Sequence, residues 1–210
     1  MKIDAWLDIA CPFCYIGLIN FNKGMEGYNG STPLEIEYRS FQLERTIGTA
    51  PTETLIERLS EKYNQSEEET KNMVDDVVTR GRDAGIEMNM DKVLPVNTLD
   101  AHRLVKYAVT EGKTIETLEQ LFKAYFRDGI NVADHAALID IAENIGLDTT
   151  AVKEMLSGNQ YKMEVISDQN LARDMGIQGV PFLALNMQYA VGGARSPEDY
   201  LKAVTEIQNQ

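Results

Sequence analysis

Cysteine and histidine are scarce in this chain of 210 residues, which contains two of each. Cys11 and Cys14 are separated by two residues, whereas His102 and His135 lie far from them in the sequence. A structural zinc site needs four ligands, and a single C-x-x-C pair supplies only two. We therefore predict no metal site. A stabilising disulfide is also disfavoured, because a bridge between Cys11 and Cys14 would close a very short loop.

Positive charge and long apolar runs are lacking as well. The chain has 20 Lys and Arg against 33 Asp and Glu, which gives a net charge of -13. Nucleic acids and anionic membrane surfaces are bound by clustered Lys and Arg, so we expect neither as a partner. No stretch approaches the roughly 20 apolar residues of a membrane span. The first residues contain no apolar run of signal-peptide length, and we expect a cytoplasmic protein.

The first forty residues show the pattern of a β-α-β unit. Residues 2–7 alternate polar and apolar side chains, as a strand with one buried face does. Pro12 is acceptable at the first position of a following helix, because that position needs no N–H donor. Residues 34–38 alternate again and predict a second strand. These three elements together predict a β-α-β unit.

The remaining pattern is mostly helical. From about residue 52 to residue 175 the apolar residues recur at helical spacing, with a capping box from Ser66 to Glu69. Two short strands, 182–185 and 189–191, follow on either side of an Asn-Met-Gln turn, and a helix with Ser196 as N-cap ends the chain. We therefore predict an α/β fold: a thioredoxin-like domain of residues 1–45 plus 176–210, with an all-helical domain, 46–175, inserted between its second and third strands.

The segment D-I-A-C-P-F-C-Y-I-G, residues 8–17, joins the first strand to the first helix. A C-x-x-C pair beside a β-α-β pattern in a cytosolic chain is typical of thioredoxin-like redox proteins. Free backbone N–H groups and the helix dipole favour a thiolate at Cys11. Cys14 lies one turn further on, where it can attack a mixed disulfide formed on Cys11. We predict that Cys11 is the exposed nucleophile and Cys14 the sheltered resolving thiol.

The second half of the predicted site is a proline far along the chain. A thioredoxin-like fold requires a proline with a cis peptide bond at the start of its third strand, and Pro181 directly precedes the strand F-L-A-L. The cis form of such a bond costs only about 0.5–1 kcal/mol. It would leave the backbone of Val180 available to an extended substrate peptide. The alternative is that Pro181 merely begins an edge strand.

Several segments together resemble the FrnE-like branch of the DsbA family of thiol-disulfide oxidoreductases. They include W-L-D-I-A-C-P-F-C-Y-I-G, N-T-L-D-A-H-R-L and G-I-Q-G-V-P-F-L-A-L. The resemblance implies that Cys11 is the nucleophile, that Cys14 is the resolving cysteine, and that Pro181 is the cis-proline after Val180. Phe13 departs from the family pattern, which has tryptophan in FrnE-like proteins and histidine in DsbA. Because it lies between the cysteines, Phe13 bears on the redox potential and is a candidate to contact substrate.

The predicted function is exchange of electrons with protein or peptide disulfides, with no cofactor beyond the cysteine pair and glutathione as a candidate reductant. The sequence also resembles kappa-class glutathione transferases and 2-hydroxychromene-2-carboxylate isomerases, in which a segment like N-T-L-D-A-H-R-L lies near the active site. That likeness makes Asn97 and His102 candidates to line a substrate cleft. Those enzymes use a serine where this chain has Cys11, and G-G-A-R, residues 192–195, lacks their glutathione-binding Asp-Ser pair. A chaperone-like binding module is the third alternative, and it would need neither cysteine.

Overall fold

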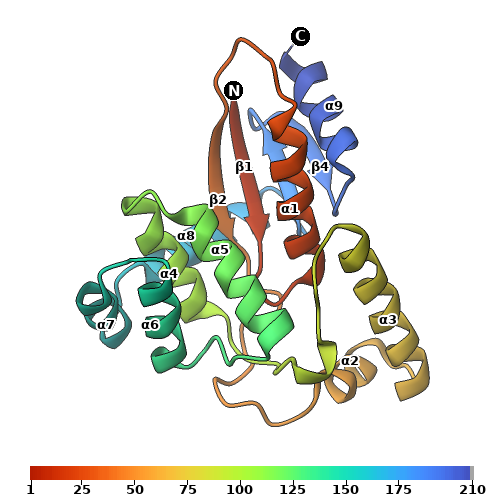
Figure 1. Ribbon diagram of the computed structural model, residues 1–210, viewed down its shortest axis with the longest axis vertical. Coiled ribbons are helices and arrows are strands. Elements are labelled where there is room, and N and C mark those ends of the chain that lie inside the picture. The colour runs from red at the N-terminus through yellow and green to blue at the C-terminus, as the bar shows by residue number, and fades with distance from the viewer. Residues whose placement is uncertain (209–210) are drawn as a thin grey trace. The chain divides into compact units, whose positions relative to one another are not determined.

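The computed structural model describes residues 1–208 and divides into two units (Figure 1). The sheet unit consists of Met1–Leu43 together with the chain from Ile166 onward, and the helical unit consists of Glu44–Val165. The chain returns from the helical unit to the sheet unit between Val165 and Ile166, earlier than the predicted boundary at 175/176. The reason is the helix Lys162–Asp174 (α8), whose later part packs in the sheet unit, where Ala172 joins the apolar cluster around Trp6.

The sheet unit is built on four strands in the spatial order β2-β1-β3-β4. Strand β1 runs parallel to β2 and antiparallel to β3, which in turn is antiparallel to β4. The strands are β1 (Lys2–Leu7), β2 (Glu35–Ser40), β3 (Phe182–Leu185) and β4 (Tyr189–Gly192). The predicted insertion between the second and third strands is confirmed, because all of the helical unit lies between β2 and β3 in the sequence.

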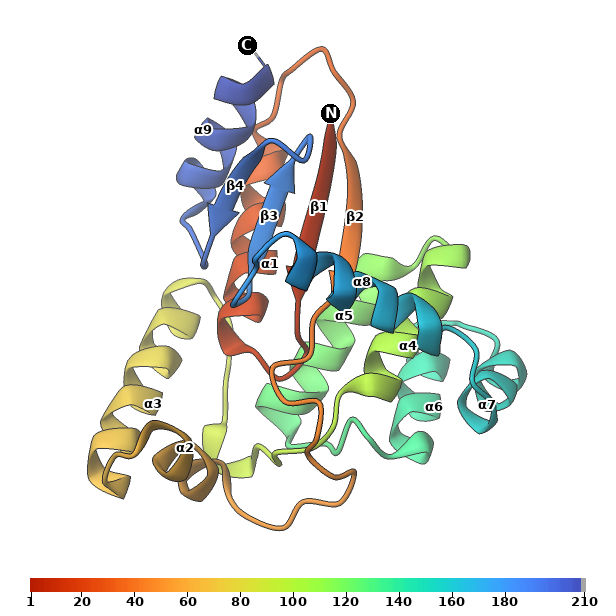
Figure 2. The same ribbon diagram turned by 180° about the vertical axis from the view of Figure 1, so that it is seen from behind.

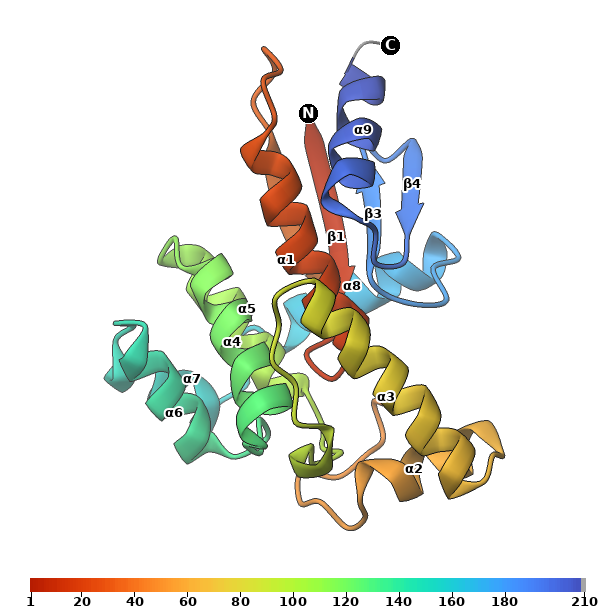
Figure 3. The same ribbon diagram turned by 45° about the vertical axis from the view of Figure 1, so that its right-hand side comes forward.

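Helices lie on both faces of the sheet. The helices α1 (Pro12–Glu26) and α9 (Pro197–Gln208) pack against each other on one face, where they lie side by side in Figures 1 and 3. Figure 2 shows α8 on the opposite face. Side chains of β1 alternate accordingly, so that Leu7 points toward the α1 face and Trp6 toward α8. Strand β1 is consequently buried along nearly its whole length.

Local sequence signals determine where α1 and α9 begin. Pro12 begins α1, as predicted, and Cys11 is its N-cap. At α9 the Ser196 hydroxyl accepts a hydrogen bond from the backbone N–H of Asp199 at 3.1 Å, which confirms the predicted cap. Such caps satisfy N–H groups that the first turn of a helix leaves without intrahelical partners.

A buried ion-pair network attaches α8 to the sheet. The Asp168 carboxylate accepts hydrogen bonds from the Ser40 N–H at 2.8 Å and from the Arg39 guanidinium at 3.1 Å. The same guanidinium contacts Asp4 of β1 at 2.7 Å. The indole N–H of Trp6 donates to the backbone carbonyl of Asp168 at 3.1 Å. Because Asp4 and Asp168 are almost fully buried, their charges depend on this pairing.

The helical unit consists of two groups of helices. The first two helices pack against each other, and those from α4 to α7 form the second group. The elements are α2 (Leu55–Tyr63), α3 (Glu67–Asp83), α4 (Leu99–Thr110), α5 (Thr114–Lys123), α6 (His135–Asn144) and α7 (Thr149–Ser157), with a 3₁₀ turn, η1 (Met90–Lys92), and a π-helical turn, η2 (Ala124–Asp128). None of the helices formed by residues 1–208 combines the length and apolar character needed to cross a bilayer.

The predicted capping box is present at the start of α3, where the Ser66 hydroxyl accepts from the Glu69 N–H and the Glu69 carboxylate accepts from the Ser66 N–H. A second box, between Thr54 and Glu57, begins α2. In both boxes the hydrogen bonds lower the pKa of the glutamate, because they stabilise its ionised form. Local sequence therefore determines where these two helices begin.

The turn between β3 and β4 contains an unfavourable residue. Asn186 and Met187 have φ values of 50° and 57°, and the Gln188 N–H donates to the Leu185 carbonyl at 3.1 Å. Positive φ at both central positions is characteristic of type I′ turns, for which Asn-Gly is a preferred sequence. Met187 occupies the position that glycine fits best, and its side chain is 46% exposed.

Replacing Met187 with glycine should therefore stabilise the protein. We expect Met187→Gly to raise the free energy of unfolding by about 0.5–1 kcal/mol, because the side-chain clash of the left-handed conformation is removed. Gln188→Gly, a change to an exposed residue in the same turn without positive φ, is the matched control and should lower stability. Urea denaturation measures both, and equal effects of the two substitutions would contradict this account.

Candidate active site

The cysteine pair lies where the chain leaves β1 and enters α1. A tight turn precedes the helix, with the Cys11 N–H donating to the Asp8 carbonyl at 3.1 Å and the Cys14 N–H donating to the Cys11 carbonyl at 3.0 Å. Cys11 is therefore the last residue before the helix, and Cys14 lies within the first turn. This places Cys11 at the positive end of the helix dipole.

Cys11 is less exposed than the sequence predicts. The residue is only 4% exposed, because the chain around Val180 covers it. Its thiol donates a hydrogen bond to the Val180 carbonyl at a sulfur–oxygen distance of 3.5 Å. The expectation of an exposed thiol at Cys11 is thus wrong for this structure. The covering segment comes from a part of the chain distant in sequence, so local sequence gives no sign of it.

Cys14 is sheltered, as predicted, with 1% of its surface exposed. Burial raises the pKa of the Cys14 thiol well above its usual value, because the thiolate would lose its hydration. The hydrogen bond with Cys11 raises the pKa further. The Asp8 N–H acts in the opposite direction by donating to the Cys14 sulfur at 3.4 Å. Cys14 is therefore protonated near neutral pH when both cysteines are reduced.

A buried carboxylate, Asp8, organises the turn that carries the cysteines. It is 1% exposed, and its oxygens accept from the backbone N–H groups of Ala10 at 3.4 Å and Leu43 at 2.7 Å. Its charge also raises the pKa of Cys14, although less than burial does. Sequence reasoning missed Asp8, since an aspartate at the end of a strand usually belongs to an exposed turn. Its position three residues before a C-x-x-C pair was the available signal.

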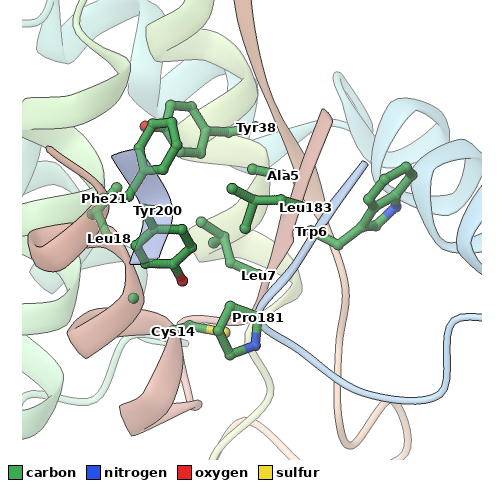
Figure 4. Close-up of a pocket in the computed structure, with 11 residues that line it drawn as sticks. Ala5, Trp6, Leu7, Cys14, Leu18, Phe21, Tyr38, Pro181, Leu183 and Tyr200 are labelled. Atoms are coloured by element: carbon green, nitrogen blue, oxygen red, sulfur yellow. The ribbon is translucent and has the colours of Figure 1, made fainter. Parts of the chain in front are cut away.

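The segment Val180–Pro181 completes the site. The peptide bond between these residues is cis, and Pro181 is buried while Val180 is half-buried. Figure 4 shows Pro181 next to Cys14 at the end of a small cavity. Phe13 is half-buried in the first turn of α1. Cys11, Cys14 and Val180 are thus brought together from the two ends of the sequence.

Asn97 and His102 belong to the helical unit, and the structure gives each a place in its packing. The Asn97 amide donates to the backbone carbonyls of Arg45 and Ile47, both at 3.0 Å. Its oxygen accepts from the Leu99 N–H at 2.9 Å. His102 is 1% exposed within α4. Both residues thus have structural partners within the helical unit, and their predicted place in a substrate cleft stays a prediction.

Residues 1–208 contain no group of three or more His, Cys, Asp or Glu side chains that could hold a metal ion. The polar groups near the two cysteines include backbone N–H and carbonyl groups, the Asp8 carboxylate and the Tyr200 hydroxyl. This arrangement offers two thiols, a hydrogen-bond acceptor and a buried charge.

The family model of the DsbA-like thioredoxin domain matches residues 2–205, nearly the whole chain. The protein belongs to the DsbA-like thioredoxin domain family. Membership agrees with the sheet order, the helical insertion and the cysteine pair at the start of α1. It does not distinguish the FrnE-like branch from others in the family, so that part of the resemblance stays a prediction.

Solved structures show the same fold. A probable DsbA oxidoreductase from Streptomyces coelicolor is 29% identical, with a TM-score of 0.94 over 100% of this chain and 91% of that one. Cytosolic disulfide reductase DsbM from Pseudomonas aeruginosa, solved with GSH, is 12% identical, with a TM-score of 0.71 and full coverage of both chains. A 2-hydroxychromene-2-carboxylate isomerase is 18% identical, with a TM-score of 0.70 over 100% of this chain and 95% of that one. The latter two likenesses concern the fold alone.

The two thiols of this DsbA-like protein should differ in reactivity. We expect iodoacetamide near neutral pH to modify Cys11 before Cys14, because burial holds Cys14 in its protonated form and only a thiolate is a good nucleophile. Peptide mapping of the reduced protein after brief alkylation gives the order. The single variants Cys11→Ser and Cys14→Ser serve as controls for assignment. Faster modification of Cys14 would reverse the two roles.

Asp8→Asn should lower the pKa of the Cys14 thiol, because it removes a nearby negative charge that disfavours the thiolate. Ultraviolet absorbance of the thiolate measures this in the Cys11→Ser background, in which Cys14 is the one remaining cysteine. Stability should fall by about 1 kcal/mol, since the hydrogen bond from the Leu43 N–H is weakened.

The control for Asp8→Asn is Glu26→Gln, which removes an exposed carboxylate at the other end of α1. It should leave the Cys14 titration unchanged. A pKa of Cys14 that rises in Asp8→Asn, or stays the same, would contradict the role assigned to the carboxylate.

Proposed function

We propose that the protein is a thiol-disulfide oxidoreductase that acts on protein or peptide disulfides through Cys11 and Cys14. The observation that carries the proposal is the arrangement of the two sulfurs. Cys11 is the N-cap of α1 with its thiol directed to the Val180 carbonyl, and Cys14 lies buried in the first turn of the helix, hydrogen-bonded to Cys11. A nucleophilic and a resolving thiol need this relation to each other.

The chemistry proceeds in two exchanges. In the first, the Cys11 thiolate attacks one sulfur of a client disulfide. A bond forms between Cys11 and the client, and the other client sulfur leaves with the electron pair as a thiolate. In the second, Cys14 gives its proton to solvent and attacks the Cys11 sulfur. A bond forms between Cys11 and Cys14, the bond between Cys11 and the client breaks, and the second client sulfur leaves as a thiolate. Both client thiolates then take up protons from solvent. The client disulfide is thereby reduced to two thiols, and Cys11 and Cys14 are oxidised to a disulfide.

The same steps in reverse would oxidise a client dithiol. Which direction dominates depends on the reduction potential of the pair relative to its surroundings: about -270 mV is typical of thioredoxin and about -120 mV of DsbA. A hydrogen bond from the Cys11 thiol and the high pKa of Cys14 both bear on the stability of the reduced form. Phe13, between the two cysteines, is the further residue we propose to tune the potential and to contact the client.

Backbone groups at Val180 are proposed to hold the client. Strand β3 begins at Phe182, so that Val180 lies outside the hydrogen-bonded ladder between β1 and β3. A client peptide in extended form could therefore pair with the Val180 backbone, as in strand addition. The carbonyl that accepts from the Cys11 thiol is on the same residue. An approaching client would thus meet both the peptide-binding group and the nucleophile.

We propose that glutathione is the reductant of the cysteine pair. We also propose that the protein acts in the cytoplasm. Support comes from the shared fold with the cytosolic disulfide reductase DsbM, which was solved with GSH. The shared fold with 2-hydroxychromene-2-carboxylate isomerase makes a glutathione-dependent transferase or isomerase the second candidate. That candidate needs a bound glutathione thiol and gives no task to Cys14. A binding module without turnover is the third, and it would retain its activity in a double Cys→Ala variant.

Removing the resolving thiol should trap clients. In Cys14→Ser, Cys11 can still attack a disulfide, but no neighbouring thiol can release the product. We expect covalent adducts with disulfide-containing proteins that disappear on treatment with a reducing agent, visible by non-reducing electrophoresis. Turnover of a model disulfide such as insulin should fall by at least about a hundredfold, because the intramolecular attack with its high effective concentration is lost.

Cys11→Ser is the matched control for trapping. Since it removes the nucleophile, it should abolish both turnover and adducts. The proposed function would be wrong if Cys14→Ser formed no adducts while the wild-type protein conjugated or isomerised small molecules with glutathione.

A further inference from the structure

Three elements of the sheet unit meet closely at one point beside the cysteines. Gly17 lies in the middle of α1, where glycine is intrinsically unfavourable. A Cβ atom at this position would lie 3.1 Å from the Cγ of Pro181 and 3.2 Å from the Tyr200 hydroxyl. Glycine therefore allows α1 to pack closely against Pro181 and against Tyr200 of α9.

Tyr200 is held firmly at this point. The residue is 1% exposed, and its ring packs edge-on against Phe21 with 5.5 Å between ring centroids. Figure 4 shows the hydroxyl end of the ring directed toward Cys14 and Pro181. The hydroxyl donates a hydrogen bond to the Gly193 carbonyl at 3.3 Å. The roles proposed so far for Cys11, Cys14 and Val180 do not require a buried tyrosine at this position.

Gly193 connects Tyr200 to the segment that covers Cys11. The Gly193 N–H donates to the Pro181 carbonyl at 2.8 Å, so hydrogen bonds run from α9 through Gly193 to Pro181. On the other side of the same segment, the Val180 carbonyl accepts from the Cys11 thiol at 3.5 Å. The position of Val180 over Cys11 is thus connected to Tyr200 through Pro181 and Gly193.

A small space remains beside this segment in spite of its close contact with Gly17. A cavity of about 20 Å³ lies among Pro181, Tyr200, Cys14 and Gly17, and a space of this size can hold about one water molecule. Atoms that line such a space lack packing partners on that side, so they gain less from van der Waals contacts there. Directional hydrogen bonds are then the means of holding Pro181 at a fixed height.

We propose that Tyr200 is a positioning residue of the redox site, which sets the Val180–Pro181 segment at the height over Cys11 that a client peptide requires. This inference rests on the proposed function. Tyr200 acts on the client-binding backbone through Gly193 and Pro181. The segment that it holds provides the backbone to which an extended client would bind.

The hydroxyl is suited to a permanent structural bond. Burial raises the pKa of Tyr200 to about 12; the Arg195 backbone lowers it, and the nearby Cys14 sulfur raises it. Tyr200 therefore remains a hydrogen-bond donor throughout the pH range in which protein thiols ordinarily ionise. Its contact with the Gly193 carbonyl would not be lost when Cys11 ionises.

Tyr200→Phe tests the proposal, because it removes the hydroxyl and keeps the buried ring. The probe is a short cysteine peptide whose sulfur carries 2-nitro-5-thiobenzoate as leaving group. Attack by Cys11 forms the Cys11–peptide disulfide and releases the coloured thiolate, which is followed by absorbance. We expect the rate with this peptide to fall roughly fivefold, the equivalent of one ordinary hydrogen bond. Alkylation of Cys11 by iodoacetamide should not become slower, since that small reagent needs no bound peptide and the Val180 segment covers the thiol in the wild-type protein.

The matched control is Tyr28→Phe. The Tyr28 hydroxyl also donates to a backbone carbonyl of the sheet unit, that of Thr32 at 2.8 Å, but it has no hydrogen bond to the chain around Pro181. Tyr28→Phe should lower the free energy of unfolding, measured by urea denaturation, about as much as Tyr200→Phe does. It should change neither the rate with the peptide nor the rate of alkylation. Gly17→Ala is the second test, because its added methyl group must displace Pro181 or Tyr200 while the hydroxyl is retained. It too should slow the peptide reaction more than alkylation.

Two results would overturn the role of Tyr200. In the first, Tyr200→Phe reacts with the peptide as fast as the wild-type protein. In the second, Tyr200→Phe loses as much of its alkylation rate as of its rate with the peptide. If Tyr200→Phe does not fold, Gly17→Ala decides the matter by the same comparison of rates. A wild-type protein that alkylates at Cys11 but never reacts with the peptide would instead contradict the proposed function, and the role of Tyr200 with it.

Discussion

A single buried carboxylate connects the two parts of the sequence that make up the sheet unit. Asp168, in the returning helix α8, accepts from Ser40 and Arg39 of β2, and its backbone carbonyl accepts from Trp6 of β1. Burying such charges is costly unless every partner is present. The network therefore specifies how α8 lies on the sheet. Because the chain then leads through Val180 and Pro181 into β3, the placement of the whole site depends on that pairing.

Much of the fold could be predicted because its signals are local. Alternation identified β1 and β2, the capping box identified the start of α3, and the C-x-x-C pair fell at the beginning of a helix as expected. The prediction failed for features that are determined by contacts between distant parts of the chain. The covering of Cys11 by Val180, the burial of Asp8 and the position of α8 depend on contacts between residues far apart in the sequence. Periodicity contains no information on such contacts, and the motif around Pro181 predicted that Val180 belongs to the site but not that it buries Cys11.

The two cysteines differ because their surroundings differ, although they are identical in chemistry and only one helical turn apart. Cys14 is enclosed by the core, which disfavours its thiolate, whereas Cys11 lies at the helix end beneath a segment that contributes a carbonyl. Thioredoxin-like folds are shared by proteins with several chemistries, and the fold alone does not select among them. In this chain the selection is made by the residues at the β1–α1 junction and by the segment Val180–Pro181. The helical unit lies between them in the sequence but supplies neither part.

The discontinuous sheet has a consequence for how the protein emerges from the ribosome. Strands β1 and β2 and both cysteines are synthesised first, yet the other edge of β1 pairs with β3, which follows the whole helical unit. Until β3 arrives, the central strand of the sheet has an open edge, and Cys11 has no carbonyl above it. Domains generally fold as units during synthesis, so the helical unit can form while the sheet waits. The nascent chain thus carries two uncovered thiols and an unpaired strand, which makes early oxidation and strand pairing with other chains the hazards of its biogenesis.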